Sequence, residues 1–415
     1  MLPHKWYRQV TVIFLVALLA GQAAPLLAQE NLPKVFCGEL DTEDCLLLQR
    51  SRQAMAEVTA VRSSSHTLFQ LADMPTLTVN GETVEIPEVA VDLSIDNAYA
   101  FDERTAEQWQ ALAGIDQNVM ALAALVAPES ILQLFAGLTA ETTLQLRFSD
   151  AVQTWLSQES GERFPAEINL TMRLVDNQLY IDLNEIAAAI GASDPPAAWG
   201  VIDLDELWAV PARDRESPSP AMVIAFMVGA LAARNNEQLV TYYEDFQRLR
   251  VLDRQLAPGR MVRVERGDDQ TINGITVNTY ITTVDVRQLA TWLAGLLQKL
   301  LTQTSDDIDP EVTVALTMGP SFLAGVESTT TLYIEPATAR VHRQENALVW
   351  DFTPFLSMAS LLARQSGEEL QVESAAGANP QLSFRTETDF DYATPVVVAV
   401  PEDVVAVPLD EVFGE

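Results

Sequence analysis

The two cysteines are the residues whose type and spacing indicate a definite chemistry. Cys37 and Cys45 stand in the segment CGELDTEDC, at the start of the first predicted helix. An even pair this close in sequence is typical of one local disulfide in an oxidising compartment. The spacing is not the C-x-x-C of a redox motif, and no nearby histidine completes a metal site. We therefore predict a structural disulfide whose loop belongs to an N-terminal lead, residues 29–43.

Histidine chemistry has few candidates, because the chain contains 3 histidines and His4 lies in its basic N-terminal start. His66 closes the polar segment SSSH between the first predicted helix and the first predicted strands. His342 lies beside two arginines in the alternating segment ARVHRQEN, which predicts a solvated strand face. No nucleophile-elbow, zinc-protease, Walker or dinucleotide-glycine motif is present. A Ser–His–Asp triad stays open in principle, but we predict no catalytic residue, no cofactor and no enzyme activity.

Carboxylates are the most abundant ionisable groups, with 58 Asp and Glu against 25 Lys and Arg and a net charge of −33. With so many carboxylates, pairs that resemble a glycosidase site must occur by chance. Such a pair is therefore no evidence for catalysis, and a hydrolase is the weakest alternative. Residues 203–207 and 306–311 offer oxygen ligands for calcium but lack the glycine and spacing of an EF-hand loop, so we predict no metal site. The acidic surface would repel nucleic acid and anionic membranes, which bind through Lys or Arg.

The N-terminal residues predict export from the cytoplasm. A basic start precedes an apolar core at residues 10–20, and small residues follow. The apolar run is shorter than the roughly 20 residues that span a bilayer. We predict a signal peptide, residues 1–28, cleaved after Ala28 or alternatively after Ala23. Neither cut leaves a terminal cysteine for lipid attachment, so we expect a soluble protein that does not span the membrane and is periplasmic, at the cell surface or secreted.

The apolar residues recur at helical spacing in several blocks. The first predicted helix covers residues 44–62 and is capped by Asp44, and the most amphipathic covers 286–301. Others are predicted over 103–138, 221–233, 241–256 and 354–364.

Strand alternation fills the segments between these helices. Asn80-Gly81 and Asp176-Asn177 predict hairpin turns inside 76–86 and 167–183. Further strands are predicted over 88–101, 142–150, 199–207, 261–265, 274–283, 311–318, 328–335, 339–352, 380–392 and 395–400. Strands in series with helices in blocks predict an α+β fold: one strongly curved antiparallel sheet with helices covering its concave face. We expect a single large domain over residues 44–410.

The predicted helices carry more apolar residues than one narrow packing stripe requires. Where such helices do not fill the hollow of a curved sheet, an apolar cavity remains, and flexible methionines suit one that accepts varied acyl chains. An ordinary packed core is the alternative. The side chains that we expect to line a cavity are Met222, Phe226, Trp292, Leu296, Phe355 and Met358.

Several segments resemble the envelope lipid-carrier superfamily of LolA-type lipoprotein carriers and mycobacterial LprG/LppX-type lipoproteins. They are VRSSSH, DNQLYIDL, AAWGVIDLDEL, NGITVNTYITTVDVRQL, TTTLYIEPATARVHR and FRTETDFDYATPVVVAVPED. The resemblance implies a half-barrel sheet, with a lid helix after NGITVNTYITTVDV and a tight turn at YIEPAT. The chain departs from it by lacking the lipid-anchored cysteine of the mycobacterial members and by extra helical residues near 103–140 and 213–260.

These observations predict a non-catalytic carrier that holds the acyl chains of a lipid or lipidated molecule in an apolar cavity. The alternative is an envelope sensor or assembly protein that uses the same fold to bind a protein partner.

Overall fold

The computed structural model describes the larger part of the chain between residues 35 and 407. The described residues are 35–79, 81–107, 136–160, 164–189, 195, 197–209, 262–291, 294–295, 298, 319–321, 323–366, 370–373 and 378–407. The predicted signal peptide, the predicted helices at 221–233 and 241–256, and the predicted strand at 311–318 lie outside these residues.

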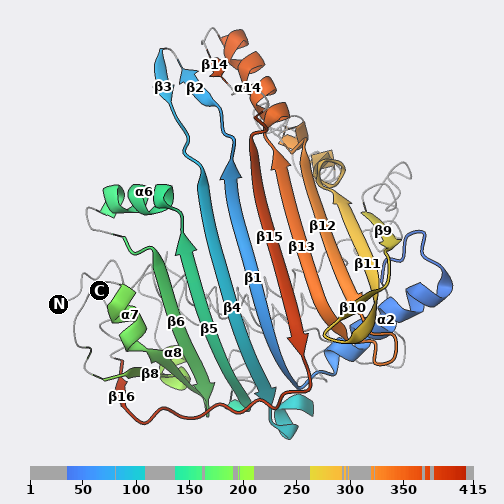
Figure 1. Cartoon of the computed structure of the whole chain (residues 1–415), viewed down its shortest axis with the longest axis vertical. Helices are drawn as coiled ribbons and strands as arrows, with labels where there is room; N and C mark the ends of the chain where they lie inside the picture. Colours follow the sequence, from blue (N-terminus) through green and yellow to red (C-terminus); the bar gives the residue numbers. More distant parts are fainter. Residues whose placement is uncertain are drawn as a thin grey trace.

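A sheet of thirteen strands dominates the structure (Figure 1). The strand order is β10-β11-β12-β13-β15-β1-β4-β5-β6-β7-β8-β16, and β9 pairs with β11. All these pairings are antiparallel except that of β16 with β8. The strands are β1 Ala60–Ala72, β4 Val89–Phe101, β5 Leu138–Phe148, β6 Glu167–Val175, β7 Gln178–Asp182, β8 Trp199–Asp203, β9 Val262–Arg266, β10 Gln270–Ile272, β11 Ile275–Asp285, β12 Val326–Ile334, β13 Val341–Asp351, β15 Gln381–Asp391 and β16 Val404–Ala406.

A smaller sheet of three strands lies at one end of the large one (Figure 1). It consists of β14 Leu370–Glu373, β2 Thr76–Val79 and β3 Glu82–Val84, in the order β14-β2-β3. The predicted Asn80-Gly81 hairpin is confirmed, because β2 and β3 pair around these two residues. The strand β14 had no counterpart among the predicted elements.

Two-residue turns with positive backbone φ fix further hairpins of the large sheet. Asp176 and Asn177, at φ 50° and 62°, join β6 to β7 as predicted. Asn273 and Gly274, at φ 50° and 83°, join β10 to β11 in the same way. Positive φ at both central positions matches the twist of the flanking strands. The prediction placed only a connecting loop at the residues of β10.

Strict alternation gives the large sheet two chemically different faces. Cross-strand partners such as Phe69, Phe384 and Val91 point to one face, which we call the apolar face. Their sequence neighbours point to the other, which we call the charged face. The apolar face carries Val61, Phe69, Leu71, Val91, Leu93, Ile95, Tyr99, Leu144, Leu146, Phe148, Leu170, Met172, Leu174, Leu348, Trp350, Leu382 and Phe384.

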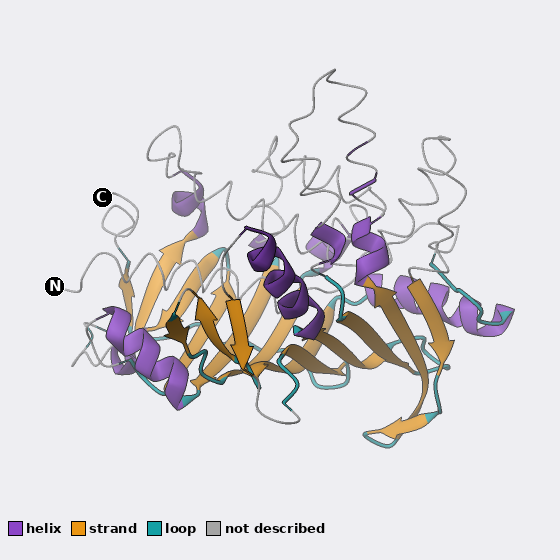
Figure 2. Cartoon of the chain, turned by 90° about the horizontal axis from the view of Figure 1, so that it is seen from above, coloured by secondary structure: helices purple, strands orange, loops and turns teal. Residues whose placement is uncertain are grey.

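Helix α2, Thr42–Ala56, packs across one end of the apolar face. Its Leu47, Leu48 and Met55 are buried in one cluster with Tyr99 of β4 and Leu174 of β6. The other bounded helices are α6 Asp150–Ser160, α7 Leu183–Ala189, α8 Leu204–Ala209 and α14 Thr353–Ser366. The sheet curves around the side that carries α2 and α14 (Figure 2). The predicted fold, a curved antiparallel sheet with helices on its concave face, is confirmed.

The predicted first helix is too long at both ends. It was expected over 44–62, but α2 begins at Thr42 and ends at Ala56, and residues from Ala60 onward form β1. Asp41, not Asp44, caps the helix, because its Oδ1 accepts hydrogen bonds from the backbone N–H groups of Glu43 and Asp44 at 2.9 Å. The segment VRSSSH is a strand because β15 and β4 pair with it on both sides.

Near the end of the sheet, one predicted strand is wrong in part and another is wrong throughout. Residues 199–207 form β8 and then the helix α8, whose first turn is capped where Asp203 Oδ1 accepts from the Asp205 N–H at 2.8 Å. Residues 395–400 pair with no strand. They cross the charged face, where Arg62 and Arg173 donate to the carbonyl oxygens of Pro395 and Ala399. The chain then forms β16 beside β8. Helices α6 and α7 had no predicted counterpart.

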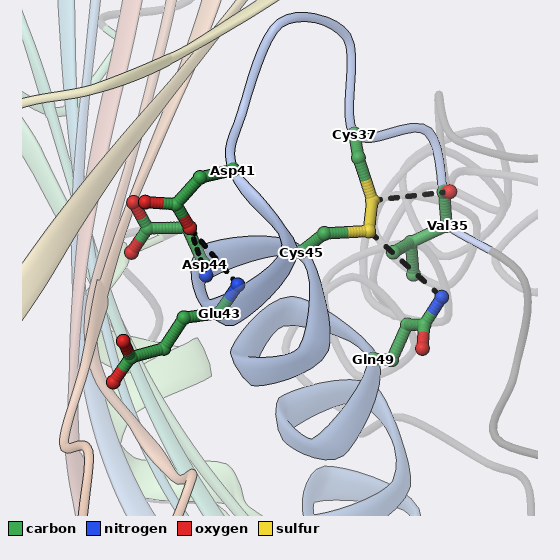
Figure 3. Close-up of a disulfide and its surroundings, with 7 residues drawn as sticks. All are labelled: Val35, Cys37, Asp41, Glu43, Asp44, Cys45 and Gln49. Carbon is green, nitrogen blue, oxygen red and sulfur yellow. Dashed lines mark hydrogen bonds between the residues drawn. A yellow bond between two sulfur atoms is a disulfide. The ribbon is translucent and has the colours of Figure 1, made fainter.

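The predicted disulfide is confirmed: the Cys37 and Cys45 sulfur atoms are bonded, with the two Cα atoms 5.3 Å apart (Figure 3). Cys45 belongs to the first turns of α2, so the bond ties the N-terminal lead to this helix.

Reduction of this disulfide should destabilise the protein. Closing so short a loop restricts the unfolded chain by about 2–3 kcal/mol in the chain-entropy account. We expect urea unfolding of the wild type to shift to lower urea when a reductant is added. The double variant Cys37→Ser/Cys45→Ser should unfold at that lower midpoint with or without reductant, and a midpoint equal to that of the oxidised wild type would contradict a stabilising role.

Candidate functional site

Helix α2 seals one end of the apolar face. Below it, the facing side chains of Val61, Tyr99, Ala140 and Leu174 are between 2% and 4% exposed. Phe390 and Tyr392 complete this packing from the end of β15. The end beneath α2 is therefore ordinary packed core.

The opposite end of the same face is only half-buried. Leu348, Phe384, Phe69 and Val91 form one cross-strand row, and each of them keeps part of its surface exposed. The next row, toward α14, contains Val326, Trp350, Leu382 and Leu71, and it too is half-buried. We call these two rows the open end of the apolar face. Apolar surface that stays partly exposed in a curved sheet is what an apolar ligand could cover.

An aromatic cluster borders this open end. Trp350 lies at the end of β13, with its ring centroid 4.5 Å from that of Phe352 and 6.2 Å from that of Phe355. Phe352 and Phe355 are 6.3 Å apart, edge to face. The backbone holds the corner, because the Phe352 N–H donates to the Pro380 carbonyl at 2.8 Å and Asp351 Oδ1 caps α14 through the Thr353 N–H. The cluster thus joins the end of β13 to the first turn of α14.

The polar side chains on the apolar face bond to one another. Ser65 and Thr388 hydroxyls are 2.8 Å apart, and those of Thr67 and Thr386 are 2.9 Å apart. Thr142 donates to Asn97 Oδ1 at 2.8 Å. Each of these side chains thus has a hydrogen-bond partner on the same face, so a band of polar residues can lie within an apolar surface.

The charged face is crossed by ion pairs between neighbouring strands. Arg343 donates to both carboxylate oxygens of Asp389, at 2.7 and 3.0 Å, and contacts Glu387 at 2.7 Å. The bonds to Asp389 raise the pKa of Arg343. Arg173 pairs with Glu141 across β6 and β5 at 2.6 Å. Such pairs suit a face that lies in water, whereas the opposite face of the sheet is apolar.

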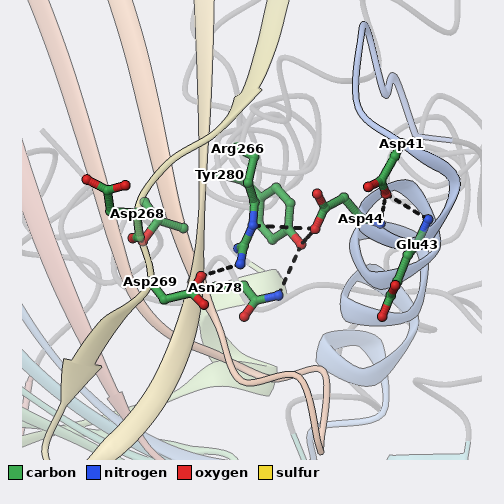
Figure 4. A network of polar contacts seen from close by, with 9 residues as sticks. Asp41, Glu43, Asp44, Arg266, Asp268, Asp269, Asn278 and Tyr280 are labelled. Atoms are coloured by element: carbon green, nitrogen blue, oxygen red, sulfur yellow. Dashed lines mark hydrogen bonds and ion pairs between the residues drawn. The ribbon is translucent and has the colours of Figure 1, made fainter.

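A polar network anchors the start of α2 to β9 and β11 (Figure 4). The Tyr280 hydroxyl donates to Asp44 Oδ1 at 2.5 Å, and Arg266 pairs with the same carboxylate at 3.5 Å. The Arg266 guanidinium also lies 5.2 Å from the centre of the Tyr280 ring. Burial raises the pKa of Tyr280 to about 12, and the hydrogen bond to Asp44 adds to the rise. Asp44 thus positions α2 instead of capping it.

The structure places only some of the predicted lining residues. Phe355 and Met358 lie on α14 and are half-buried, and Phe355 joins the aromatic cluster. Met222, Phe226, Trp292 and Leu296 lie outside the described residues. The sequence reasoning missed the cluster partners Trp350 and Phe352. Trp350 follows Leu348 by two residues in a predicted strand, so both were expected on the same face.

The two histidines among the described residues are both paired with carboxylates. His66 lies within β1, not between elements, and its Nε2 is 3.0 Å from Asp92 on the charged face. The solvated position predicted for His342 is wrong, since its side chain is 12% exposed and 3.1 Å from Glu335. The pairing of β12 with β13 shifts register here, so His342 is the extra residue of a β-bulge and its ring turns edge-on to Tyr392.

No group of three or more His, Cys, Asp or Glu residues that could hold a metal ion occurs in the part of the chain that the structure describes. Asp203, in one of the two segments considered and rejected for calcium, caps α8. The other candidate, residues 306–311, lies outside the described residues. Within the same described ranges, no helix combines the length and the apolar composition needed to cross a membrane.

No family model and no curated protein matches the sequence. Among solved structures, the chain is similar to the lipoprotein LppX of Mycobacterium tuberculosis, at 10% identity and a TM-score of 0.25, over 86% of this chain and 100% of that one. LprF of Mycobacterium bovis follows at 9% identity and 0.25, over 86% and 95%. An outer-membrane lipoprotein-sorting domain of Vibrio parahaemolyticus follows at 7% identity and 0.14, over 84% and 93%. Likenesses this distant transfer neither a family, nor a ligand, nor an activity to this chain.

Alkaline pH should test the anchoring network. The folded pKa of Tyr280 lies near 12, above its ordinary value of 10.0, so the unfolded state releases its proton first and stability falls as pH rises from 10 through 12. Asp44→Asn removes one cause of the rise, so its loss of stability over this range should be smaller than that of the wild type. At neutral pH the variant should lose about 1–3 kcal/mol, because Arg266 and Tyr280 lose a charged partner.

The measurement is urea unfolding at a series of pH values. Asp41→Asn is the matched control, because asparagine caps a helix as well as aspartate does and Asp41 bonds to Glu43 and Asp44 backbone groups only. If Asp44→Asn and Asp41→Asn behaved alike, the proposed role of the network would be wrong.

Proposed function

We propose that the protein is a non-catalytic, extracytoplasmic carrier that binds the acyl chains of a lipid or lipidated molecule on the open end of its apolar face. The observation that carries this proposal is the contrast within one face. The end under α2 is sealed at 2–4% exposure, whereas the rows through Phe69, Leu348 and Trp350 stay half-buried. A face that only needed to be packed would not keep this difference.

Acyl chains are the ligand that suits such a surface. Each CH₂ group moved from water onto it contributes about 0.8 kcal/mol, so affinity needs no charge and no reaction. Phe355 and Met358 would line the site from α14, and Met222, Phe226, Trp292 and Leu296 remain proposed lining residues. We further propose that residues 44–410 form a single domain, in keeping with a sheet whose strands extend from Ala60 to Ala406.

An extracytoplasmic location is supported by two independent features. The N-terminal residues have the basic, apolar and small-residue order of a signal peptide. The disulfide between Cys37 and Cys45 persists in oxidising compartments and is rare in the reducing cytosol.

Native mass spectrometry of the chain from Gln29, exported in a bacterial host, tests binding directly. We expect a stoichiometric adduct of lipid mass that extracts into organic solvent. A bare polypeptide mass that persists after incubation with phospholipid vesicles would contradict the carrier and favour a partner protein on the same face.

Two adjacent substitutions in β1 test where the lipid binds. Phe69→Asp places a charge on the open end, so we expect lipid occupancy to fall at least about tenfold, because the cost of burying an unpaired charge exceeds 1.4 kcal/mol. Gln70→Asp adds the same group one residue away on the charged face, where Gln70 is exposed, and should leave occupancy unchanged. Circular dichroism establishes that both variants fold; should Phe69→Asp unfold, Phe69→Asn replaces it. Equal occupancy in the two folded variants would exclude this face.

A further inference from the structure

Buried polar atoms without a partner are rare and costly, so each one within the described residues requires a reason. They are Tyr99 Oη, Asn177 Oδ1, Glu185 Oε2, Arg266 Nη1 and Trp350 Nε1. Asn177 lies in a hairpin turn, and Glu185 and Arg266 have partners for their other polar atoms. Tyr99 is sealed in the core beneath α2. Among these five residues, only Trp350 has an unpartnered polar atom and also lies at the half-buried open end of the apolar face.

The surroundings of Trp350 define what could bond to it. An indole N–H can only donate, so its partner must be an acceptor. Its cross-strand neighbours Val326 and Leu382 are apolar, and so are its ring partners Phe352 and Phe355. With no cation among these neighbours, a phosphate or a free carboxylate would be left buried without a counter-charge. The fitting acceptor is therefore a neutral oxygen that enters together with an apolar chain.

We infer that Trp350 recognises an ester-linked acyl lipid, its Nε1–H donating to the ester carbonyl oxygen while the acyl chain lies along the rows through Leu348 and Leu382. This inference rests on the proposed function and adds to it a ligand class. The aromatic cluster fixes the indole, so the donor is already oriented when the lipid arrives. Two residues farther along the chain, Phe352 begins the turn into α14, which places the carbonyl near that helix and the chain along the sheet.

A pair of lipids that differ only in the carbonyl tests this inference. Dipalmitoylphosphatidylcholine and its di-O-hexadecyl ether analogue share head group and chain length, but the ether lacks the acceptor. Presented in competition from mixed vesicles and measured by extraction and mass spectrometry, the ester should be preferred about three- to tenfold by the wild type, the range for one neutral hydrogen bond.

Trp350→Phe should bind both lipids equally, with ether binding close to that of the wild type, because the ring contacts remain and only the donor is lost. Trp199→Phe is the matched control. Trp199 lies on the charged face, with the Arg173 guanidinium 4.8 Å from the ring centre, and its loss should leave the ester preference intact.

A second readout keeps the test independent of how well Trp350→Phe folds. In wild-type protein with ¹⁵N-labelled tryptophan, the Trp350 indole proton resonance should move downfield with the ester lipid and not with the ether. Equal binding of both lipids by the wild type, without this shift, would overturn the inference while leaving the carrier proposal standing. Failure of both lipids to bind would count against the carrier proposal itself.

Discussion

The cross-strand register of the large sheet is the constraint on which the remaining structure depends. A slip of one residue would exchange the two faces of a strand, moving Phe69 into water and His66 into the apolar layer. Pairing on both sides prevents this for β1, which is held by β15 and β4 along nearly its whole length. Ion pairs such as Arg343 with Asp389 add charge complementarity across neighbouring strands on the charged face. The chemistry of each face follows from this register.

The apolar face created by the register is completed differently at its two ends. At one end α2 is fixed by the Cys37–Cys45 bond and by the contacts of Asp44 with Tyr280 and Arg266, and its apolar side chains close the core. At the other end α14 begins directly from the sheet at Phe352, and the rows beside it stay half-buried. In the proposed carrier, a sealed end next to a less covered one would allow ligand exchange without unfolding the core.

The residues that lie at the open end come from distant parts of the chain. Phe69 belongs to β1, Leu348 and Trp350 to β13, and Phe384 to β15. The sequence reasoning placed Phe355 and Met358 on a helix, which is α14 in the structure, but it did not single out Trp350, because helices were weighed for apolar excess and strands were not. Within β13, the two-residue spacing of Leu348 and Trp350 was sufficient to place both on one face. The spacing did not show which helix these side chains meet.

Local sequence determined many of the strands, the hairpin at Asp176-Asn177, the disulfide and the fold class, since alternation, turn chemistry and cysteine spacing act over a few residues. Only the tertiary structure decided where α2 ends, because the segment after Ala56 becomes a strand through pairing with β15, more than three hundred residues away. It likewise decided the burial of His342, since a β-bulge turns that residue out of the alternation. Such outcomes depend on partners brought together by folding, and no local pattern encodes them.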